Sequence, residues 1–245
     1  MMVLGTKVSI TNLDHANAYI EDCVKKREKT YICIAPVSTI VDAHADERYR
    51  EIVNHSGLTT PDGMPLVWLG KWRGKRTISR TYGPDLMFKF FAISQTKGYK
   101  HYFYGGSQET NRLLVSRLRE QFPGVNIVGD FPPSIMKVCQ VESESVLRAI
   151  NDAKPDVLWI GLGSPKQDYW MSNHRPLLDV PVMIGVGAAF DFIAGTKKQA
   201  PRWMHHAGLE WFFRLCCEPR RLWKRYLFGN TKFICLLLMN SFRKE

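Results

Sequence analysis

The 245-residue sequence lacks several patterns, and each absence removes a class of protein from consideration. No apolar run approaches the roughly 20 residues that a membrane-spanning helix requires. Residues 1–19 show no basic-then-apolar signal pattern, so we expect a cytoplasmic protein. The six cysteines form neither a C-x-x-C pair nor a regular framework, and we expect reduced, mostly buried thiols.

Several catalytic motifs are also missing. The chain has no Gly-x-Ser-x-Gly, no Gly-Lys-Ser/Thr P-loop and no His-Glu-x-x-His. It has no Asp-x-Asp either, so a divalent cation bridging a diphosphate has no obvious ligands. His205 and His206 stand beside Trp203, where surface or packing roles are more usual than metal binding. We therefore expect neither a metal nor another bound cofactor.

Positive charge is concentrated towards the C-terminal end. The formal charge is +11, and residues 201–245 hold nine basic and three acidic side chains, which is +6 of that total. The same segment is rich in aromatic residues. Basic residues mixed with Trp and Tyr suit an anionic membrane surface better than nucleic acid. We expect this segment to bind a membrane surface, and we expect no nucleic-acid partner.

Apolar runs alternate with helical patterns, which predicts an α/β fold with a Rossmann-like, mostly parallel sheet flanked by helices. The expected strands are 7–10, 30–35, 100–105, 126–130, 156–161 and 180–187. The expected helices are 14–27, 42–54, 61–72, 84–97, 107–121, 141–153 and 165–174. From residue 200 the pattern changes to two or three helices without a strand, one of them starting at Pro219. We therefore expect an α/β domain over 1–199 and a helical appendage over 200–245.

One strand runs into the turn "IGLGSPKQDYWM" at 160–171. Gly161 and Gly163 permit positive φ and close approach of a ligand, and Ser164 can cap a helix that Pro165 begins. The third glycine of the dinucleotide fingerprint is absent, so the turn does not indicate NAD. Gln167 can bond back to the helix start or contact an anion, and spacing alone does not separate these roles.

A second turn of the same kind follows another strand. "YFYGGSQET" at 102–110 places Gly105 and Gly106 before a helix that Ser107 can cap. Two such turns at the carboxyl end of one parallel sheet predict a nucleotide site in the crevice between them. A further strand ends at Gly187, with Asp191 beyond it. Asp191 can bond a ligand hydroxyl or secure the turn.

Two more segments carry charged groups at helix starts. "TTPDGMPLVW" puts Asp62 in the first turn of a helix after Thr60. This carboxylate can complement the helix dipole, which is the commoner role, or act as a general base. "SRTYGPDLM" has the same ambiguity. Arg80 and Tyr82 can hold a phosphate, or Asp85 can simply complement a helix start.

In this order, these segments resemble the WecG/TagA/CpsF family of bacterial glycosyltransferases (glycosyltransferase family 26). The resemblance covers nearly the whole chain. Its residues are "TPDGMPLVW", "RTYGPDLM", "YFYGGSQE", "IGLGSPKQDYWM", "IGVGAAFDFIAGTKKQAPRWM" and "GLEWFFRLCCEPRRLWKRYL". The family implies transfer of a sugar from a UDP-sugar to a lipid-linked acceptor, usually an undecaprenyl-diphosphate sugar. The transfer is expected to invert the anomeric centre without a metal, at the inner face of the cell membrane, in exopolysaccharide, capsule or wall polymer synthesis.

The resemblance also implies roles for individual residues. Asp62 matches the family aspartate that acts as general base, and Arg214 and Arg221 match catalytic arginines of the appendage. The turn residues Lys166 and Gln167 match a uridine nucleotide site. The substrate-binding residues expected altogether are Thr60, Arg80, Tyr82, Asp85, Gly105, Gly106, Gly161, Gly163, Lys166, Gln167, Gly187, Asp191 and Arg220.

One position departs from the family pattern. Many members carry Thr-Pro-Asn after the second strand, whereas this chain has "APVSTI", with Val37 at the place of the asparagine. The departure leaves the donor sugar open between N-acetylmannosamine, glucose and another hexose.

Other functions are also consistent with parts of the sequence. A dehydrogenase or methyltransferase with a Rossmann-like sheet is the first alternative, and the incomplete glycine fingerprint argues against it. A non-catalytic module that binds nucleic acid or membranes is the second, and charge alone supports it. A homo-oligomer is left open.

Overall fold

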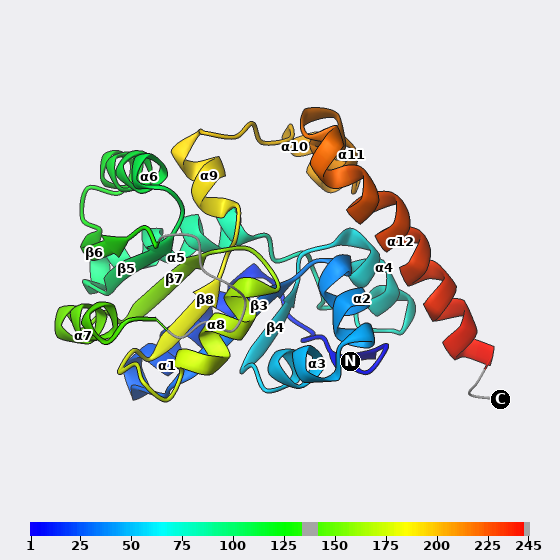
Figure 1. The fold of residues 1–245 in the computed structure, drawn as a ribbon, viewed down its shortest axis with the longest axis horizontal. Coiled ribbons are helices and arrows are strands. Elements are labelled where there is room, and N and C mark those ends of the chain that lie inside the picture. The colour runs from blue at the N-terminus through cyan, green and yellow to red at the C-terminus, as the bar shows by residue number, and fades with distance from the viewer. Residues whose placement is uncertain (134–141, 243–245) are drawn as a thin grey trace.

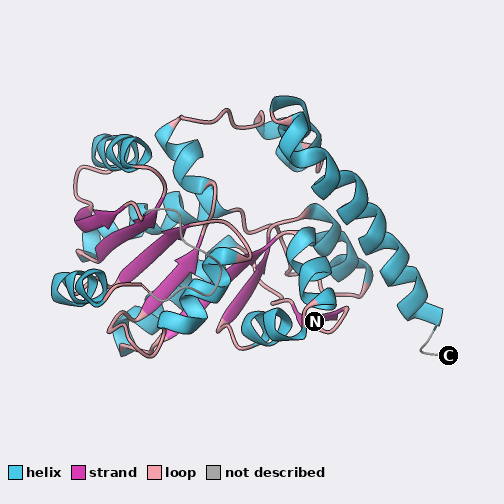
Figure 2. Cartoon of the chain, in the orientation of Figure 1, coloured by secondary structure: helices cyan, strands magenta, loops and turns pink. Residues whose placement is uncertain are grey.

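Six parallel strands form the centre of the protein (Figure 1, Figure 2). The computed structural model describes residues 1–133 and 142–242, except for the side chains at 206, 221, 224–228, 241 and 242. The strands follow the order β4-β3-β8-β7-β5-β6, and every neighbouring pair is parallel. They are β3 (Thr30–Ala35), β4 (Leu58–Pro61), β5 (Lys100–Gly105), β6 (Asn126–Phe131), β7 (Val157–Gly161) and β8 (Val182–Gly185). The predicted α/β, Rossmann-like fold is confirmed.

Helices cover both faces of this sheet because successive strand side chains point to opposite sides. In β3, for example, Ile32 packs into one core and Cys33 into the other. One face carries α1 (Leu13–Lys26), α5 (Gly83–Lys97), α6 (Gln108–Gln121) and α9 (Ala189–Ala194). The other carries α3 (Glu47–Asn54), α7 (Glu144–Ala153) and α8 (Lys166–His174), with the end of α2 (Val37–Ala45).

The structure corrects two predicted elements at the β4 edge of the sheet. Residues 7–10 do not form a strand of this sheet, since the chain there makes only a hairpin of β1 (Met2–Val3) and β2 (Thr6–Lys7). The sixth strand is instead Leu58–Pro61, which pairs with β3. The predicted helix 42–54 is two helices, because Asp46 accepts a hydrogen bond from the Tyr49 backbone N–H (3.1 Å) and starts α3.

In the described part of residues 200–245 the chain forms three helices, in agreement with the two or three that the sequence predicts. They are α10 (Arg202–His206), α11 (Glu210–Cys217) and α12 (Pro219–Phe242), and Pro219 does start the last one. In Figure 1, α12 runs along α2, where Phe233 is buried beside Val37 and Val41. Within the described ranges, no helix has both the length and the apolar character needed to cross a membrane.

The cysteines differ from the expectation in one respect. Cys23 and Cys33 are buried, but Cys216, Cys217 and Cys235 on the appendage helices are exposed, and Cys139 lies outside the described residues. The expectation of mostly buried thiols was wrong because the appendage packs against the core on one side only.

The direction in which successive strands are added to the sheet changes between β5 and β7: β6 is added outward from β5, and β8 is added on the opposite side of β7. α6 leaves β5 on one face, and α8 leaves β7 on the other, so the connections diverge at this point. Ligands of such sheets bind beyond the carboxyl ends of the strands near a divergence of this kind. The two glycine turns meet here: Gly106 N donates to the Gly161 carbonyl at 3.4 Å.

Candidate active site

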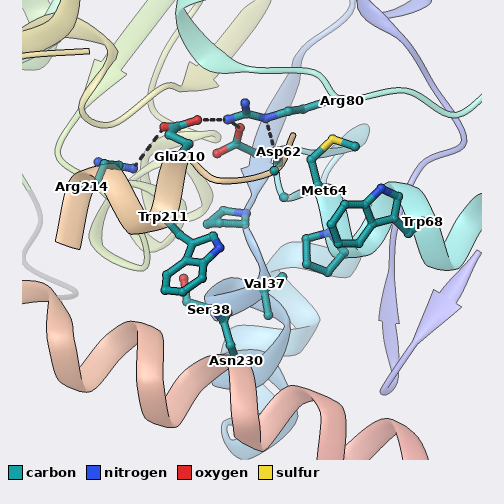
Figure 3. A pocket seen from close by; sticks show the side chains of 14 residues that line it. Val37, Ser38, Asp62, Met64, Trp68, Arg80, Glu210, Trp211, Arg214 and Asn230 are labelled. Atoms are coloured by element: carbon teal, nitrogen blue, oxygen red, sulfur yellow. Dashed lines mark hydrogen bonds and ion pairs between the residues drawn. The ribbon is translucent and has the colours of Figure 1, made fainter. Parts of the chain in front are cut away.

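Two cavities adjoin at the carboxyl end of the sheet and share three lining residues, Pro36, Asp62 and Arg214. The first, here called the glycine cavity, has a volume of about 150 Å³ and lies beyond β3, β7 and β8, beside Gly163 and Gly187. The second, the aromatic cavity, has a volume of about 180 Å³ and lies between α2, α4 (Met64–Trp72), α11 and α12. Figure 3 shows the aromatic cavity.

Asp62 follows directly after β4, between the two cavities. Its backbone N–H donates to the Ala35 carbonyl (3.1 Å), so β3 fixes its position. Its side chain accepts a hydrogen bond from Arg80 Nη2 at Oδ1 (3.1 Å). The prediction that Asp62 lies in the first helical turn was wrong, because Pro61 ends a strand and α4 begins only at Met64.

Arg80 links Asp62 to the appendage. Its guanidinium also forms an ion pair with Glu210 of α11, and Arg214 Nη1 lies 3.8 Å from the other Glu210 oxygen. Figure 3 shows this series of four charges, Asp62–Arg80–Glu210–Arg214, here called the ion network. His205 supports it: Nε2 donates to the Ala200 carbonyl (2.9 Å), and Nδ1 lies 2.9 Å from Arg80 Nη1 and 3.0 Å from Glu210 Oε2.

Aromatic rings orient both arginines of the ion network. The Arg80 guanidinium lies 4.4 Å from the centre of the Tyr82 ring, and that of Arg214 lies 5.2 Å from the Phe192 ring. Such cation–π contacts stabilise a guanidinium that has lost part of its hydration. Both arginines are therefore held at the junction of the two cavities.

The two carboxylates of the ion network have opposite pKa shifts. Burial raises the pKa of Asp62, Arg80 opposes this, and the neighbouring charge of Glu210 raises it further. For Glu210, burial is outweighed by the hydrogen bond with His205 and the charge of Arg80, so its pKa is lowered. Asp62 is therefore the carboxylate more ready to take up a proton, as a general base requires.

Gln167 secures the turn at the glycine cavity and also lines the cavity. Its Oε1 accepts a hydrogen bond from Gly163 N (3.0 Å), and its Nε2 donates to Ser164 Oγ (3.3 Å). The capping role left open by the sequence is thus present. The helix itself begins at Lys166 rather than Pro165, and no Ser164 side chain caps it, which corrects that expectation.

The residue after Gln167 fixes α8 to α3. Asp168 is fully buried, and its Oδ2 accepts a hydrogen bond from the Tyr49 hydroxyl (2.6 Å). Burial raises the pKa of Asp168 to about 6. Nothing in the sequence pattern distinguishes this aspartate from an exposed one at a helix start.

The described residues offer no preformed cluster of metal ligands. The part of the chain that the structure describes contains no group of three His, Cys, Asp or Glu side chains arranged to hold a metal ion. The cationic groups at the glycine cavity are Arg214 and Lys197, and Lys197 pairs with Asp191 (2.7 Å).

Comparison with known proteins shows the family of the chain. The model of the WecG/TagA/CpsF family of glycosyl transferases matches residues 1–245. The chain belongs to this family. It is 30% identical over 227 residues to an N-acetylglucosaminyldiphosphoundecaprenol N-acetyl-beta-D-mannosaminyltransferase of Bacillus subtilis strain 168, covering 89% of this chain and 86% of that protein.

Proteins of the same name from other bacteria are also similar to this chain. The one from Bacillus spizizenii is 28% identical over 240 residues, 95% of this chain and 91% of that protein. The one from Staphylococcus aureus strain MRSA252 is 26% identical over 208 residues, 85% and 78% of the two chains. As a member of the WecG/TagA/CpsF family the protein is a glycosyltransferase, and this decides against a dehydrogenase, a methyltransferase or a non-catalytic module.

The fold brings some of the expected site residues together. Asp62, Arg80 and Arg214 line the aromatic cavity, and Asp62 and Arg214 also line the glycine cavity. The other expected residues that line the glycine cavity are Tyr82, Gly163, Gln167 and Gly187.

The remaining expected residues line neither cavity. Thr60 is buried within β4, while Asp85, Lys166 and Arg220 are exposed at or near helix starts. Asp191 pairs with Lys197. A Cβ added at Gly105 would meet the Gly161 backbone, Gly106 N donates to the Gly161 carbonyl (3.4 Å), and a Cβ added at Gly161 would meet the Phe190 ring. The side chain of Arg221 lies outside the described residues, so its role stays a prediction.

Sequence reasoning missed Glu210, which completes the ion network, and the apolar wall of Met64, Trp68 and Trp211. It also assigned His205 to surface or packing, whereas this ring orients Arg80. The signal for Glu210 was present in "GLEWFF", a charge inside an otherwise apolar run. Its partner Arg80 is 130 positions away, so only the fold brings the two together.

Proposed function

We propose that this glycosyltransferase moves a hexose or N-acetylhexosamine from a UDP-sugar to an undecaprenyl-diphosphate-linked sugar, with inversion and without a metal. One observation carries the proposal: Asp62 lies in the wall of both cavities. The UDP-sugar would occupy the glycine cavity and the acceptor the aromatic cavity. A base at their junction can then reach the acceptor hydroxyl beside the anomeric carbon.

The glycine cavity suits a diphosphate. The backbone at Gly163 and Gly187 has positive φ (78° and 54°), which allows a ligand to approach the main chain closely. The N-terminus of α8 lies beside it and favours negative charge. Arg214 and Lys197 add positive charge, so departing UDP can be stabilised without a metal.

Asp62 would accept the proton of the acceptor hydroxyl. The hydroxyl oxygen then attacks the anomeric carbon from the side opposite the UDP, and the bond to UDP breaks with its electron pair passing to the diphosphate. Attack from the opposite side inverts the anomeric centre. General-base assistance of this kind contributes about 10²–10⁴-fold to the rate.

The printed names of the relatives support the acceptor. These proteins act on an N-acetylglucosaminyl-diphosphoundecaprenol and transfer N-acetylmannosamine. In this chain the donor stays open, since Val37 lines the aromatic cavity at the position of the family asparagine. The protein would work at the inner face of the membrane, held there by the basic appendage, in exopolysaccharide, capsule or wall polymer synthesis.

A screen of UDP-sugars against short-chain lipid-diphosphate-sugar acceptors tests this proposal. We expect one UDP-sugar to give UDP release coupled to acceptor elongation, an inverted anomer by NMR, and an unchanged rate in EDTA. UDP release without an elongated lipid, a retained anomer or complete inhibition by EDTA would each contradict a stated part of the proposal.

A further inference from the structure

We propose that residues 68–77 form a second membrane-contact surface, on the α/β core itself, which binds anionic lipid headgroups. This surface, here called the α4 surface, comprises Trp68, Lys71, Trp72, Arg73, Lys75 and Arg76. The inference rests on the proposed function only in that the acceptor is membrane-bound. It adds a contact outside the C-terminal appendage.

Two indole rings are exposed on the α4 surface. Trp72 is 84% exposed and Trp68 is 52% exposed. A large aromatic side chain that projects into solvent is unusual in a soluble domain unless the surface binds a partner. Tryptophan beside cations is typical of proteins that lie at the lipid headgroup level.

The charge of this region has one sign. Residues 63–84 contain five Lys or Arg and no Asp or Glu. All positions from 71 to 77 are exposed, and none of their cations forms an ion pair with a carboxylate of the described ranges. The cations also lie close to the N-terminus: after burial, the charges of Lys75, Lys7 and Arg73 lower the pKa of the Met1 ammonium. An anionic surface would relieve this crowding.

The α4 surface adjoins both the appendage and the aromatic cavity. The Trp68 ring packs at Gly208, where an added Cβ would lie 3.1 Å from it, and Trp68 itself lines the cavity (Figure 3). Leu69 packs into the same small core as Leu236 and Leu237 of α12. Contact of this surface with lipid therefore places the mouth of the acceptor cavity at the membrane.

The partner that fits best is a lipid surface rather than nucleic acid or a second copy. Exposed apolar side chains continue along α12 at Ile234 and Met239, which a nucleic acid would leave in water. Like charges on the α4 surface would face one another in a two-fold contact between copies, which opposes self-association.

Vesicle co-sedimentation of the full-length protein tests the surface, with phosphatidylglycerol–phosphatidylcholine vesicles against pure phosphatidylcholine. The variant K75E/R76E is compared with R112E/R119E, which makes the same charge change at exposed positions of α6, at the other end of the sheet (Figure 1). Trp72→Ala is compared with Leu177→Ala, another exposed apolar truncation. Arg73 is left unchanged because it donates to the Met2 carbonyl (2.7 Å).

We expect K75E/R76E to lose at least about tenfold in partitioning to the anionic vesicles, with a much smaller loss in R112E/R119E. Trp72→Ala should lose several-fold and Leu177→Ala should lose nothing. Transfer to a soluble short-chain acceptor should be unchanged in K75E/R76E, so loss of vesicle binding stands even if the proposed donor or acceptor is wrong.

Equal losses in the two charge variants would overturn the proposal. So would unchanged vesicle binding in Trp72→Ala together with altered self-association by light scattering, which would assign the indole to an interface between copies. Binding of a DNA duplex as tight as that of the anionic vesicles, lost in K75E/R76E, would assign the cations to nucleic acid instead.

Discussion

The two cavities that meet at Asp62 are built in different ways. The glycine cavity is lined by residues at and beyond the ends of β3, β7 and β8, and of the described appendage residues only Arg214 lines it. The aromatic cavity takes Glu210, Trp211 and Asn230 from α11 and α12, opposite Trp68 of α4. The glycine cavity, which we propose for the nucleotide, is thus formed mainly by the α/β core, whereas the aromatic cavity, which we propose for the acceptor, is complete only when the appendage is docked.

The forces that hold the two cavities differ accordingly. Buried packing holds the glycine cavity: Gln167 is 2% exposed, and Asp168 bonds to Tyr49 beneath it. The aromatic cavity depends on a small apolar contact of α12 with α2 and on the ion network. Mutations can therefore disable one cavity while the other keeps most of its lining residues.

Phe233→Ala should have the largest effect, mainly on the aromatic cavity. Phe233 is 3% exposed in the α2–α12 contact, and truncating a buried phenylalanine typically costs about 3–5 kcal/mol. We expect the appendage to undock, which faster hydrogen exchange in α11 and α12 would show, while UDP binding by calorimetry weakens only modestly. Ile234→Ala is the control, because Ile234 is 57% exposed. Equal exchange in both variants would mean that this contact does not hold the appendage.

Gly161→Ala should damage the glycine cavity instead. An added Cβ would lie 2.5 Å from the Phe190 ring, and overpacking of this kind typically costs about 1–3 kcal/mol. We expect a lower midpoint of thermal unfolding and weaker UDP binding. Gly229→Ala on α12 serves as control, since nothing lies within 4 Å of its added Cβ. Unchanged UDP affinity in Gly161→Ala would separate this turn from the nucleotide site.

Glu210→Gln should have a smaller effect, visible in the pH profile. Asp62 must be ionised to accept a proton, so transfer falls as the pH falls through its pKa. Burial raises that pKa, and the Glu210 charge raises it further. Removing the Glu210 charge takes away this contribution and also one partner of Arg80, so the pKa of Asp62 should fall. The acid limb of kcat/KM should therefore move to lower pH. Glu109→Gln, on the exposed start of α6, should leave the limb in place. A shift of the acid limb to higher pH in Glu210→Gln would contradict this effect of the Glu210 charge on Asp62.

Much of the core could be predicted from the sequence, because its strands are continuous apolar runs buried on both faces. Strands 30–35 and 100–105 were predicted with the bounds that the structure shows, and strands 126–130, 156–161 and 180–187 differ by at most two residues at either end. β4 was missed because it is four residues long and ends in Pro61, which resembles a helix start. The beginning of α2 was missed since Val37, Thr39 and Ile40 favour strands when judged locally.

The site residues also fall into two groups, those that a local sequence pattern predicts and those that only the fold brings together. Gly163 and Gln167 carry a local signal, and the fold brings them to the glycine cavity. The link from Arg80 to Glu210 joins residues far apart in the chain, and no local pattern announces it. Gly105 and Asp85 have signals as strong as those of Gly163 and Asp62, yet they line neither cavity, because the direction of a side chain or a turn is set by the packing around it.

Asp62→Asn tests most directly whether Asp62 is the base that serves both cavities. UDP binding by calorimetry and transfer to a short-chain acceptor are measured on the same preparation, with Asp85→Asn as the exposed control. If Asp62 is the base, transfer should fall by about 10²–10⁴-fold with UDP affinity changed only a few-fold, and the control should lose nothing. Transfer that persists in Asp62→Asn, or that falls only in proportion to UDP binding, would contradict this role of Asp62.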